Sequence, residues 1–402
     1  MHVIFRLANL QNMLKAQTHI QKYLKTYPFM PKVISALAPY QPQLVGGTIR
    51  TAFWNPELFE SNIPYTDLDI TINVTDFNES NDISRVISSL ESHEIEYFKR
   101  GNNRNMLLKF TVDATRQSID LTGLQKQIDG SGFVPADSWK DCMSHRDLKC
   151  NSFCYDLVEE KLYDHVDENT DLEGDCSVRF LKDTALQTDP GRMFRFFKFV
   201  AEKYDVKNME IEENEDMVET SHDYDEKSIE KILENKIICT QVPSRLRCLK
   251  QILKYQDSGL VLNKIIDLGL SEEFFLVNLG EADLPKSCTL QNISDKLEHI
   301  QDIPKLCEAF EVNKREHDDL ILKRIGQQID LEGMIDDKGY VYTANRMDDL
   351  VRELFPTSPF TFDNESLIQV GCNRAAILTK RRYPVVRLPK KAYMKEYLVL
   401  NC

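Results

Sequence analysis

The pattern of apolar residues changes about midway along the chain, and this change limits the folds open to it. Residues 40–165 alternate short β-like runs with helices and turns. From about residue 176 onward the pattern is mainly helical, for example over 245–255 and 259–269. With 402 residues the chain is long enough for two or three domains. The simplest architecture is therefore α+β, with an N-terminal α/β head followed by an all-α remainder.

Composition excludes several classes of protein. No stretch approaches the roughly 18 uninterrupted apolar residues of a membrane span, so we expect no integral membrane protein. The ten cysteines form no Cys-x-x-Cys pair, which argues against a zinc site or disulfide scaffold and favours a reducing compartment. The net charge of -14 argues against a surface coated in positive charge, but it leaves room for a local basic groove.

The N-terminal end of the chain carries an unusual charge pattern. Residues 1–56 contain no acidic residue, and four cations lie among apolar residues: Arg6, Lys15, Lys22 and Lys25. Residues 1–30 therefore resemble a mitochondrial targeting segment, and the alternative is an N-terminal helix packed on the next domain. We expect a mitochondrial or cytoplasmic location, or both, and a nuclear location stays open.

Two further charge blocks lie beyond residue 200. Nine of the seventeen residues from 210 to 226 are acidic, which predicts a solvated loop between two helical regions. Eight cations fall within residues 374–395, and no acid follows until Glu396. This basic end is either a tail that contacts phosphates or simply a solvated surface.

A glycine pair follows the first short apolar run. Gly46 and Gly47 allow backbone amides to approach a phosphate closely, and Arg50 could add charge-assisted hydrogen bonds. A Gly-Gly pair alone is more often only a turn.

Acidic residues on two predicted strands strengthen the functional interpretation. In residues 67–74 the apolar side chains alternate, so that Asp67 and Asp69 lie together on the opposite face of a strand. Two neighbouring carboxylates repel each other, and a bound Mg²⁺ would offset the repulsion. A second strand around 117–122 could bring Asp120 to the same metal ions, which would activate a hydroxyl nucleophile and neutralise a leaving pyrophosphate. The alternative is a polar strand face near a turn.

A helix is predicted to open at Asp189, with Asp189 as N-cap and Pro190 at the first helical position. The helix would turn Phe194, Phe197 and Val200 towards the core, with Met193 and Phe196 at the margins. Its polar stripe consists of Asp189, Arg192, Arg195 and Lys198. A neighbouring Asp and Arg can hydrogen-bond the edge of a nucleobase, although they could also form only a salt bridge within the helix.

Five motifs follow one another along the chain: Gly46-Gly47-x-Ile49-Arg50, Asp67-x-Asp69, Arg146-Asp147-Leu148-x-x-Asn151-Ser152, Leu162-Tyr163-Asp164, and Asp189-Pro190-x-Arg192-x-x-Arg195. Taken in this order, they resemble those of the class II CCA-adding tRNA nucleotidyltransferases, which share them with bacterial-type poly(A) polymerases. The resemblance covers residues 40–270, including Pro243-Ser244-Arg245-Leu246 and the helix-like run after it. Each motif is weak alone, but five in the same order and spacing are specific.

The resemblance implies a nucleotidyltransferase-type head with a small twisted sheet, followed by helical neck, body and tail. The implied ranges are 31–175 for the head, 176–270 for the neck with nucleotide recognition and RNA binding, and 271–402 for the body and basic tail. It implies addition of CCA to tRNA 3′ ends from CTP and ATP, without a nucleic-acid template.

The resemblance also assigns roles to individual residues. It implies Mg²⁺ binding by Asp67 and Asp69, with Asp120 as a third catalytic carboxylate. The nucleotide-binding residues it implies are Gly46, Gly47, Arg50, Arg146, Asp147, Asp189, Arg192 and Arg195. Among these, Asp189 and Arg192 match the base-selecting pair.

Several residues depart from the family pattern. Thr51 replaces an Asp, His145 replaces the first arginine of an Arg-Arg-Asp motif, Thr188 replaces a Glu, and Gln125 stands where an arginine is usual. These departures keep a non-catalytic RNA-binding relative open as an alternative, beside a poly(A) or oligo(A) polymerase on the same scaffold.

Overall fold

The computed structural model divides the chain into two compact units, Met1–Val242 and Pro243–Cys402. It describes residues 2–59, 68–74, 81–100, 107–112, 117–128, 132–170, 172–211, 225–236, 244–299, 302–310, 312, 313, 316, 320, 341, 342, 397 and 398. The four-part division predicted from the sequence stays a prediction.

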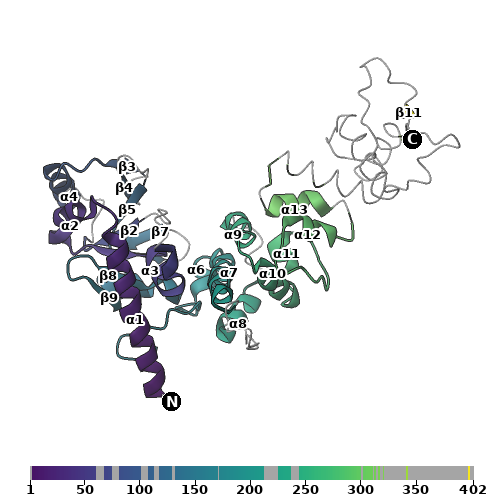
Figure 1. The fold of residues 1–402 in the computed structure, drawn as a ribbon, viewed down its shortest axis with the longest axis horizontal. Helices are drawn as coiled ribbons and strands as arrows, with labels where there is room; N and C mark the ends of the chain where they lie inside the picture. The colour runs from purple at the N-terminus through teal and green to yellow at the C-terminus, as the bar shows by residue number, and fades with distance from the viewer. Residues whose placement is uncertain are drawn as a thin grey trace. The chain divides into compact units, whose positions relative to one another are not determined.

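A seven-stranded sheet forms the centre of the first unit, with strand order β3-β4-β5-β2-β1-β8-β9 (Figure 1). Its strands are β1 (Gln43–Val45), β2 (Leu68–Ile72), β3 (Phe98–Arg100), β4 (Leu107–Val112), β5 (Gln117–Gly123), β8 (Phe153–Asp156) and β9 (Lys161–Asp164). β2 and β5 pair in parallel, and the other neighbours are antiparallel. A separate hairpin consists of β6 (Gln125–Ile128) and β7 (Gly132–Pro135). The predicted strands around 67–74 and 117–122 are confirmed as β2 and β5.

Alternation along the strands separates two apolar layers. Leu44 and Tyr155 belong to the larger core, whereas their chain neighbours Val45 and Cys154 belong to a smaller cluster on the other face. The larger core includes side chains of four helices: α1 (His2–Leu24), α2 (Met30–Leu37), α3 (Gly47–Trp54) and α4 (Asn81–Ser92). The smaller cluster includes side chains of α5 (Trp139–Ser144). The sheet therefore has α1 to α4 on one face and α5 on the other.

The N-terminal segment is one long helix that packs on the head, which is the alternative weighed against a targeting segment. α1 contacts α3 and β9, and one side of it is buried in the larger core through Met13, Ala16, Ile20, Tyr23 and Leu24. Leu14 on another side is 63% exposed. One side of the helix is thus buried because it covers the head, whereas apolar residues such as Leu7 and Leu14 are exposed on the rest of it.

A short helical stretch follows the sheet and corrects two predictions. It contains α6 (Ala185–Thr188), α7 (Arg192–Ile211) and α8 (Glu226–Glu234). The predicted start at Asp189 was wrong: Asp189 is the C-cap of α6, and its side chain accepts a hydrogen bond from the Gly191 amide before α7 begins. The marginal placement of Met193 and Phe196 was also wrong, because both are fully buried. The prediction treated the helix as packed along one stripe, but Met193, Phe194, Phe196 and Phe197 are all fully buried, so this part of it is covered on more than one side.

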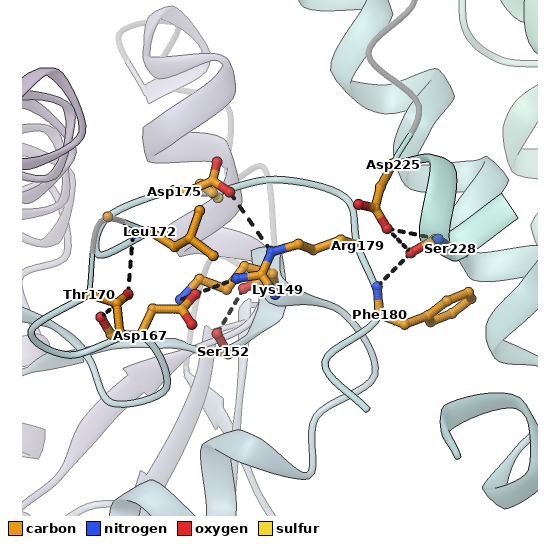
Figure 2. Close-up of polar contacts among 12 residues, drawn as sticks. Lys149, Ser152, Asp167, Thr170, Leu172, Asp175, Arg179, Phe180, Asp225 and Ser228 are labelled. Atoms are coloured by element: carbon orange, nitrogen blue, oxygen red, sulfur yellow. Dashed lines mark hydrogen bonds and ion pairs between the residues drawn. The ribbon is translucent and has the colours of Figure 1, made fainter. Parts of the chain in front are cut away.

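Buried ion pairs hold the segment that leads from the sheet to these helices (Figure 2). Lys149 has no exposed side-chain surface, and its Nζ lies 3.0 Å from Asp167 Oδ2 while it also pairs with Asp164. Arg179 pairs with Asp167 from the other side. A buried charge requires such partners, because leaving it unpaired would cost several kcal/mol. The network therefore fixes the segment before α6.

The described part of the second unit is mainly helical. Its helices are α9 (Ser244–Ile252), α10 (Ser258–Asp267), α11 (Ser271–Phe275), α12 (Leu290–Asp295) and α13 (Ile303–Ala309), and two short paired strands are β10 (Val341–Tyr342) and β11 (Tyr397–Leu398). The helices predicted around 245–255 and 259–269 are confirmed as α9 and α10. The basic stretch 374–395 and most of the acidic block 210–226 lie outside the described residues. None of the described helices is both long and apolar enough to cross a membrane.

The described part of the chain also contains three short 3₁₀ turns. They are η1 (Ala38–Tyr40), η2 (Pro56–Phe59) and η3 (Lys149–Asn151).

Candidate active site

The glycine turn lies directly against one of the predicted catalytic carboxylates. Gly46 links β1 to α3 with φ of +78°, a backbone conformation that side chains disfavour. A Cβ atom at Gly46 would also lie 2.8 Å from Asp69 Oδ2. Gly46 is therefore required twice, by its backbone angles and by the close approach of Asp69.

The second carboxylate lies beside the first. β2 and β5 pair so that Asp69 and Asp120 are direct partners on adjacent parallel strands. Asp69 is also paired with Val45, whose side chain is on the α5 face of the sheet, so both aspartates lie on that face. Two carboxylates at directly paired positions of adjacent strands provide the hard oxygen ligands that suit Mg²⁺. Asp67, which was predicted to bind Mg²⁺ together with Asp69, lies outside the described residues.

Arg50 has contacts that the sequence did not predict. Its guanidinium carbon lies 4.1 Å from the ring centre of Phe199 on α7, and its Nη1 donates to Asn151 Oδ1 at 2.5 Å. Burial lowers the pKa of Arg50, but nearby charges, Glu202 first, raise it above its ordinary value. Arg50 thus joins α3 to α7, and its predicted role at a triphosphate stays a prediction.

Asp147, Asp189 and Arg195 form a second group. Arg195 Nε lies 3.1 Å from Asp147 Oδ2, and its Nη2 donates to Asp189 Oδ2 at 2.8 Å. Asn151 Nδ2 donates to Asp147 Oδ1 at 2.8 Å. Since Asn151 also accepts from Arg50, a continuous polar path runs from α3 through Asn151 to the beginning of α7.

Arg192, the second predicted base-selecting residue, is positioned by the β6–β7 hairpin. Its Nη2 donates to Gln127 Oε1 at 2.9 Å, and its Nη1 lies 3.4 Å from the carbonyl oxygen of Ala185. The residue is only 4% exposed, and this burial lowers its pKa. Within the predicted polar stripe Arg192 is thus buried, whereas Arg195 and Lys198 are half-buried.

Two residues that depart from the family pattern, His145 and Thr51, form hydrogen bonds to backbone carbonyl oxygens nearby in the chain. His145 follows α5, and its Nδ1 lies 2.7 Å from the carbonyl oxygen of Asp141. Arg146, next in the chain, is half-buried. Thr51 Oγ1 donates to the Gly47 carbonyl oxygen at 3.1 Å, so that this side chain bonds within its own helix.

The structure therefore brings the predicted residues into two groups. One consists of Gly46, Gly47, Asp69 and Asp120, and the other of Asp147, Asp189, Arg192 and Arg195. Sequence reasoning missed Gln127 and the bridging role of Asn151. Asn151 was part of a motif, but no periodicity or spacing marks Gln127.

Comparisons with solved structures find CCA-adding enzymes. One, a complex of a CCA-adding enzyme with ATP, has a TM-score of 0.51 at 14% identity and aligns over 90% of this chain and 84% of its own. A complex with CTP has a TM-score of 0.50 at 13% identity, over 90% and 85%. A Thermotoga maritima CCA-adding enzyme complexed with tRNA has a TM-score of 0.48 at 12% identity, over 87% and 80%.

Comparisons of the sequence, by contrast, find no match. No family model matches it, and neither does any curated protein. At 13–14% identity a structural likeness identifies a shared fold. The ATP and CTP complexes therefore lead to one conclusion: this chain has the fold of the CCA-adding enzymes.

Proposed function

We propose that this chain is a template-independent nucleotidyltransferase that adds CCA to the 3′ end of tRNA from CTP and ATP. The observation that carries the proposal is the pairing of Asp69 with Asp120 on adjacent strands, beside the Gly46 turn. The fold of the CCA-adding enzymes and the order of motifs along the sequence support the same reaction.

The paired carboxylates would hold the metal ions of the reaction. Asp69 and Asp120, together with Asp67, supply the oxygen ligands that Mg²⁺ prefers. When bound, Mg²⁺ would supply activation of the RNA 3′-hydroxyl and neutralisation of the leaving pyrophosphate. The backbone amides after Gly46 lie at the beginning of α3, where a helix N-terminus favours phosphate oxygens.

The second group would read the base of the incoming nucleotide. Asp189 offers an acceptor and Arg192 offers donors, which together match the hydrogen-bonding edge of a nucleobase. Arg195 holds Asp189 and Gln127 holds Arg192, so both side chains have defined positions before a nucleotide binds. Fixed donors and acceptors lose little entropy on binding and discriminate between bases more sharply.

Removal of one carboxylate tests the chemistry. Asp69→Asn should reduce addition of labelled CTP and ATP to tRNA lacking its 3′ end by more than about a hundredfold, because even residues that only support a metal ligand typically affect activity 10- to 100-fold. Binding of the tRNA, measured by gel shift, should remain within about twofold, since the substitution leaves the RNA-binding region unchanged.

Asp137→Asn is the matched control, because this side chain is 94% exposed and its loss of charge should leave addition unchanged. Wild-type activity in Asp69→Asn would contradict the metal assignment. Each nucleotide should also be supplied separately. Strong incorporation of CTP supports CCA addition, whereas tails made only from ATP would identify an oligo(A) polymerase.

A non-catalytic tRNA-binding protein is the second candidate, favoured by Arg50. Its guanidinium lies against Phe199 and bonds Asn151, so it is occupied by contacts within the protein. Thr51 and His145 remove two further charged groups that the family carries. This candidate predicts tRNA binding with no Mg²⁺-dependent turnover of either nucleotide in the wild-type protein.

A further inference from the structure

A cavity of about 510 Å³ lies at the far end of α3 from the Gly46 turn. α1 contributes Asn9, Asn12, Lys15 and His19 to its wall. The other walls come from the end of α3 and the residues after it, from residues 174–176, and from Lys203 on α7. All of these elements belong to the first unit of the chain.

The charge of the wall favours an anion. Three of the lining side chains are basic types, Lys15, His19 and Lys203, and one is acidic, Asp175. Asp175 points towards Arg179, with 3.9 Å between its Oδ2 and Arg179 Nε (Figure 2). The two lysines thus outnumber Asp175, which already lies near Arg179. A bound phosphate would balance the positive charge of the lysines.

A buried donor gives an independent indication of a ligand. Asn9 is only 7% exposed, and its Nδ2 has no hydrogen-bond partner within the described part of the chain. Buried amide donors are nearly always paired, because an unpaired one loses its hydration without compensation. Asn9 also lines the cavity, so rotation of its amide would bring Nδ2 to an acceptor oxygen of a ligand there.

The remaining wall favours a ligand with an aromatic ring. Phe53 and Trp54 line the cavity, and Trp54 Nε1 donates to the Cys176 carbonyl oxygen at 3.0 Å, which fixes the orientation of the indole. The volume lies within the roughly 300–1,000 Å³ typical of small-molecule sites. We propose that this cavity binds a nucleoside phosphate, with the phosphate at Lys15, Lys203 and Asn9 and the base against the aromatic wall.

This site is separate from the proposed reaction centre. α3 has eight residues and is therefore about 12 Å long, with Gly47 at one end and Trp54 at the other. Between the two ends Arg50 lies with its guanidinium carbon 5.9 Å from the ring centre of Trp54. The second site does not depend on the proposed function, because no residue of its wall belongs to the two groups described above.

Fluorescence of Trp54 tests the proposal in the full-length protein. The chain has two tryptophans, so Trp139→Phe leaves Trp54 as the only indole. AMP titrated in the presence of EDTA should give a saturable change in this fluorescence. Lys15→Gln with Lys203→Gln should weaken the apparent affinity for AMP at least about tenfold, since each removes a charge-assisted hydrogen bond.

The control removes the same number of charges elsewhere on the N-terminal segment. Lys22→Gln with Lys25→Gln alters two exposed lysines outside the cavity wall and should leave AMP binding unchanged. Asn9→Ala should also weaken AMP binding, and circular dichroism melting verifies that each variant is folded. Asp69→Asn should retain full AMP binding, which separates this site from the reaction centre.

Three outcomes would overturn the proposal. The first is no fluorescence change with millimolar AMP. The second is an AMP response that is equal in the cavity variants and in the lysine control. The third is a response to pyrophosphate but not to AMP, which would show an anion site without recognition of a nucleoside.

Discussion

Asn151 links Arg50 to the second group of predicted site residues through opposite ends of one amide. Its Oδ1 accepts from Arg50 and its Nδ2 donates to Asp147, so the amide orientation is determined by both partners. Aspartate could not replace it, because a carboxylate offers no donor to Asp147 and would repel it. The Arg-Asp-x-x-x-Asn spacing in the sequence therefore has a geometric reason that becomes clear only in the folded chain.

Gln127 should determine how precisely Arg192 recognises a base. Gln127→Leu keeps the size of the side chain but removes the acceptor of Arg192 Nη2. Under the proposed function, the ratio of kcat/KM for CTP to that for UTP should fall about tenfold, because a loosely held guanidinium discriminates less. Single-nucleotide extension of tRNA measures this ratio.

Gln125→Leu on the same hairpin is the control, since the described hydrogen bonds of Arg192 go to Gln127 and Ala185. An equal loss of discrimination in both variants would mean that the hairpin as a whole, and not Gln127, affects selection.

Arg195 should make the stability of the head depend on pH through Asp147. Burial raises the pKa of Asp147, but the charge of Arg195 and the hydrogen bond from Asn151 outweigh it and hold the pKa below its ordinary value. A carboxyl with a lowered pKa stabilises the fold above its unfolded pKa of about 4, and the effect is lost as the pH falls through the folded pKa. Arg195→Met should therefore lower the free energy of unfolding by about 1–3 kcal/mol at pH 7.

The difference between Arg195→Met and wild type should narrow as the pH falls below about 4. Urea titrations at pH 7, 5 and 3.5 measure it. Lys32→Met, which breaks an exposed pair with Glu94, should give a small difference that varies little with pH. A constant, large difference for Arg195→Met would indicate lost packing instead of lost charge.

At the scale of elements, periodicity predicted those strands and helices whose type is determined by the local pattern of apolar residues. β2 and β5 were predicted because alternating apolar residues require a strand with one buried face. The beginning of α7 was misplaced because an Asp-Pro pair is typical of a helix start. The same pair also fits the place it has here, where Asp189 ends the preceding helix α6. Full burial of Met193 and Phe196 depends on elements distant in the sequence, which no window along one helix reveals.

The N-terminal helix α1 should contribute directly to the stability of the head. Ile20 is fully buried in the larger core, so Ile20→Ala should lower the free energy of unfolding by about 2–5 kcal/mol. Leu14 lies on the same helix but is 63% exposed, and Leu14→Ala should change it by less than about 0.5 kcal/mol. Urea denaturation of both variants measures the difference.

Equal effects of the two substitutions would contradict the packing of α1 described above. The result also bears on targeting, which stays a prediction for residues 1–30. Cleavage after residue 30 would remove Met13, Ile20 and Tyr23 from the core, so a removable presequence and a stable head make opposite demands on this helix.

At the scale of the whole molecule, the sequence predicted the order of architectures but not where one compact unit ends. The apolar pattern becomes helical near residue 176, yet α7 and α8 belong to the first unit. The reason is visible in single contacts: Arg50 on α3 stacks on Phe199 of α7, and the Phe180 amide donates to Ser228 of α8 (Figure 2). Such long-range contacts have no signature in local sequence.

The division of the chain into two compact units predicts separable unfolding. A fragment of residues 1–242 contains the whole sheet and helices α1 to α8, and we expect it to fold alone because domains with their own cores do so. Calorimetry of the full chain should resolve two transitions, and the fragment should reproduce one of them within about 5 °C. A fragment ending at residue 175 is the control: it lacks Phe199 and Ser228, exposes the partners of α7 and α8, and should melt lower or fail to fold. One cooperative transition in the full chain, with no folded 1–242 fragment, would mean that the second unit is required to complete the core of the first.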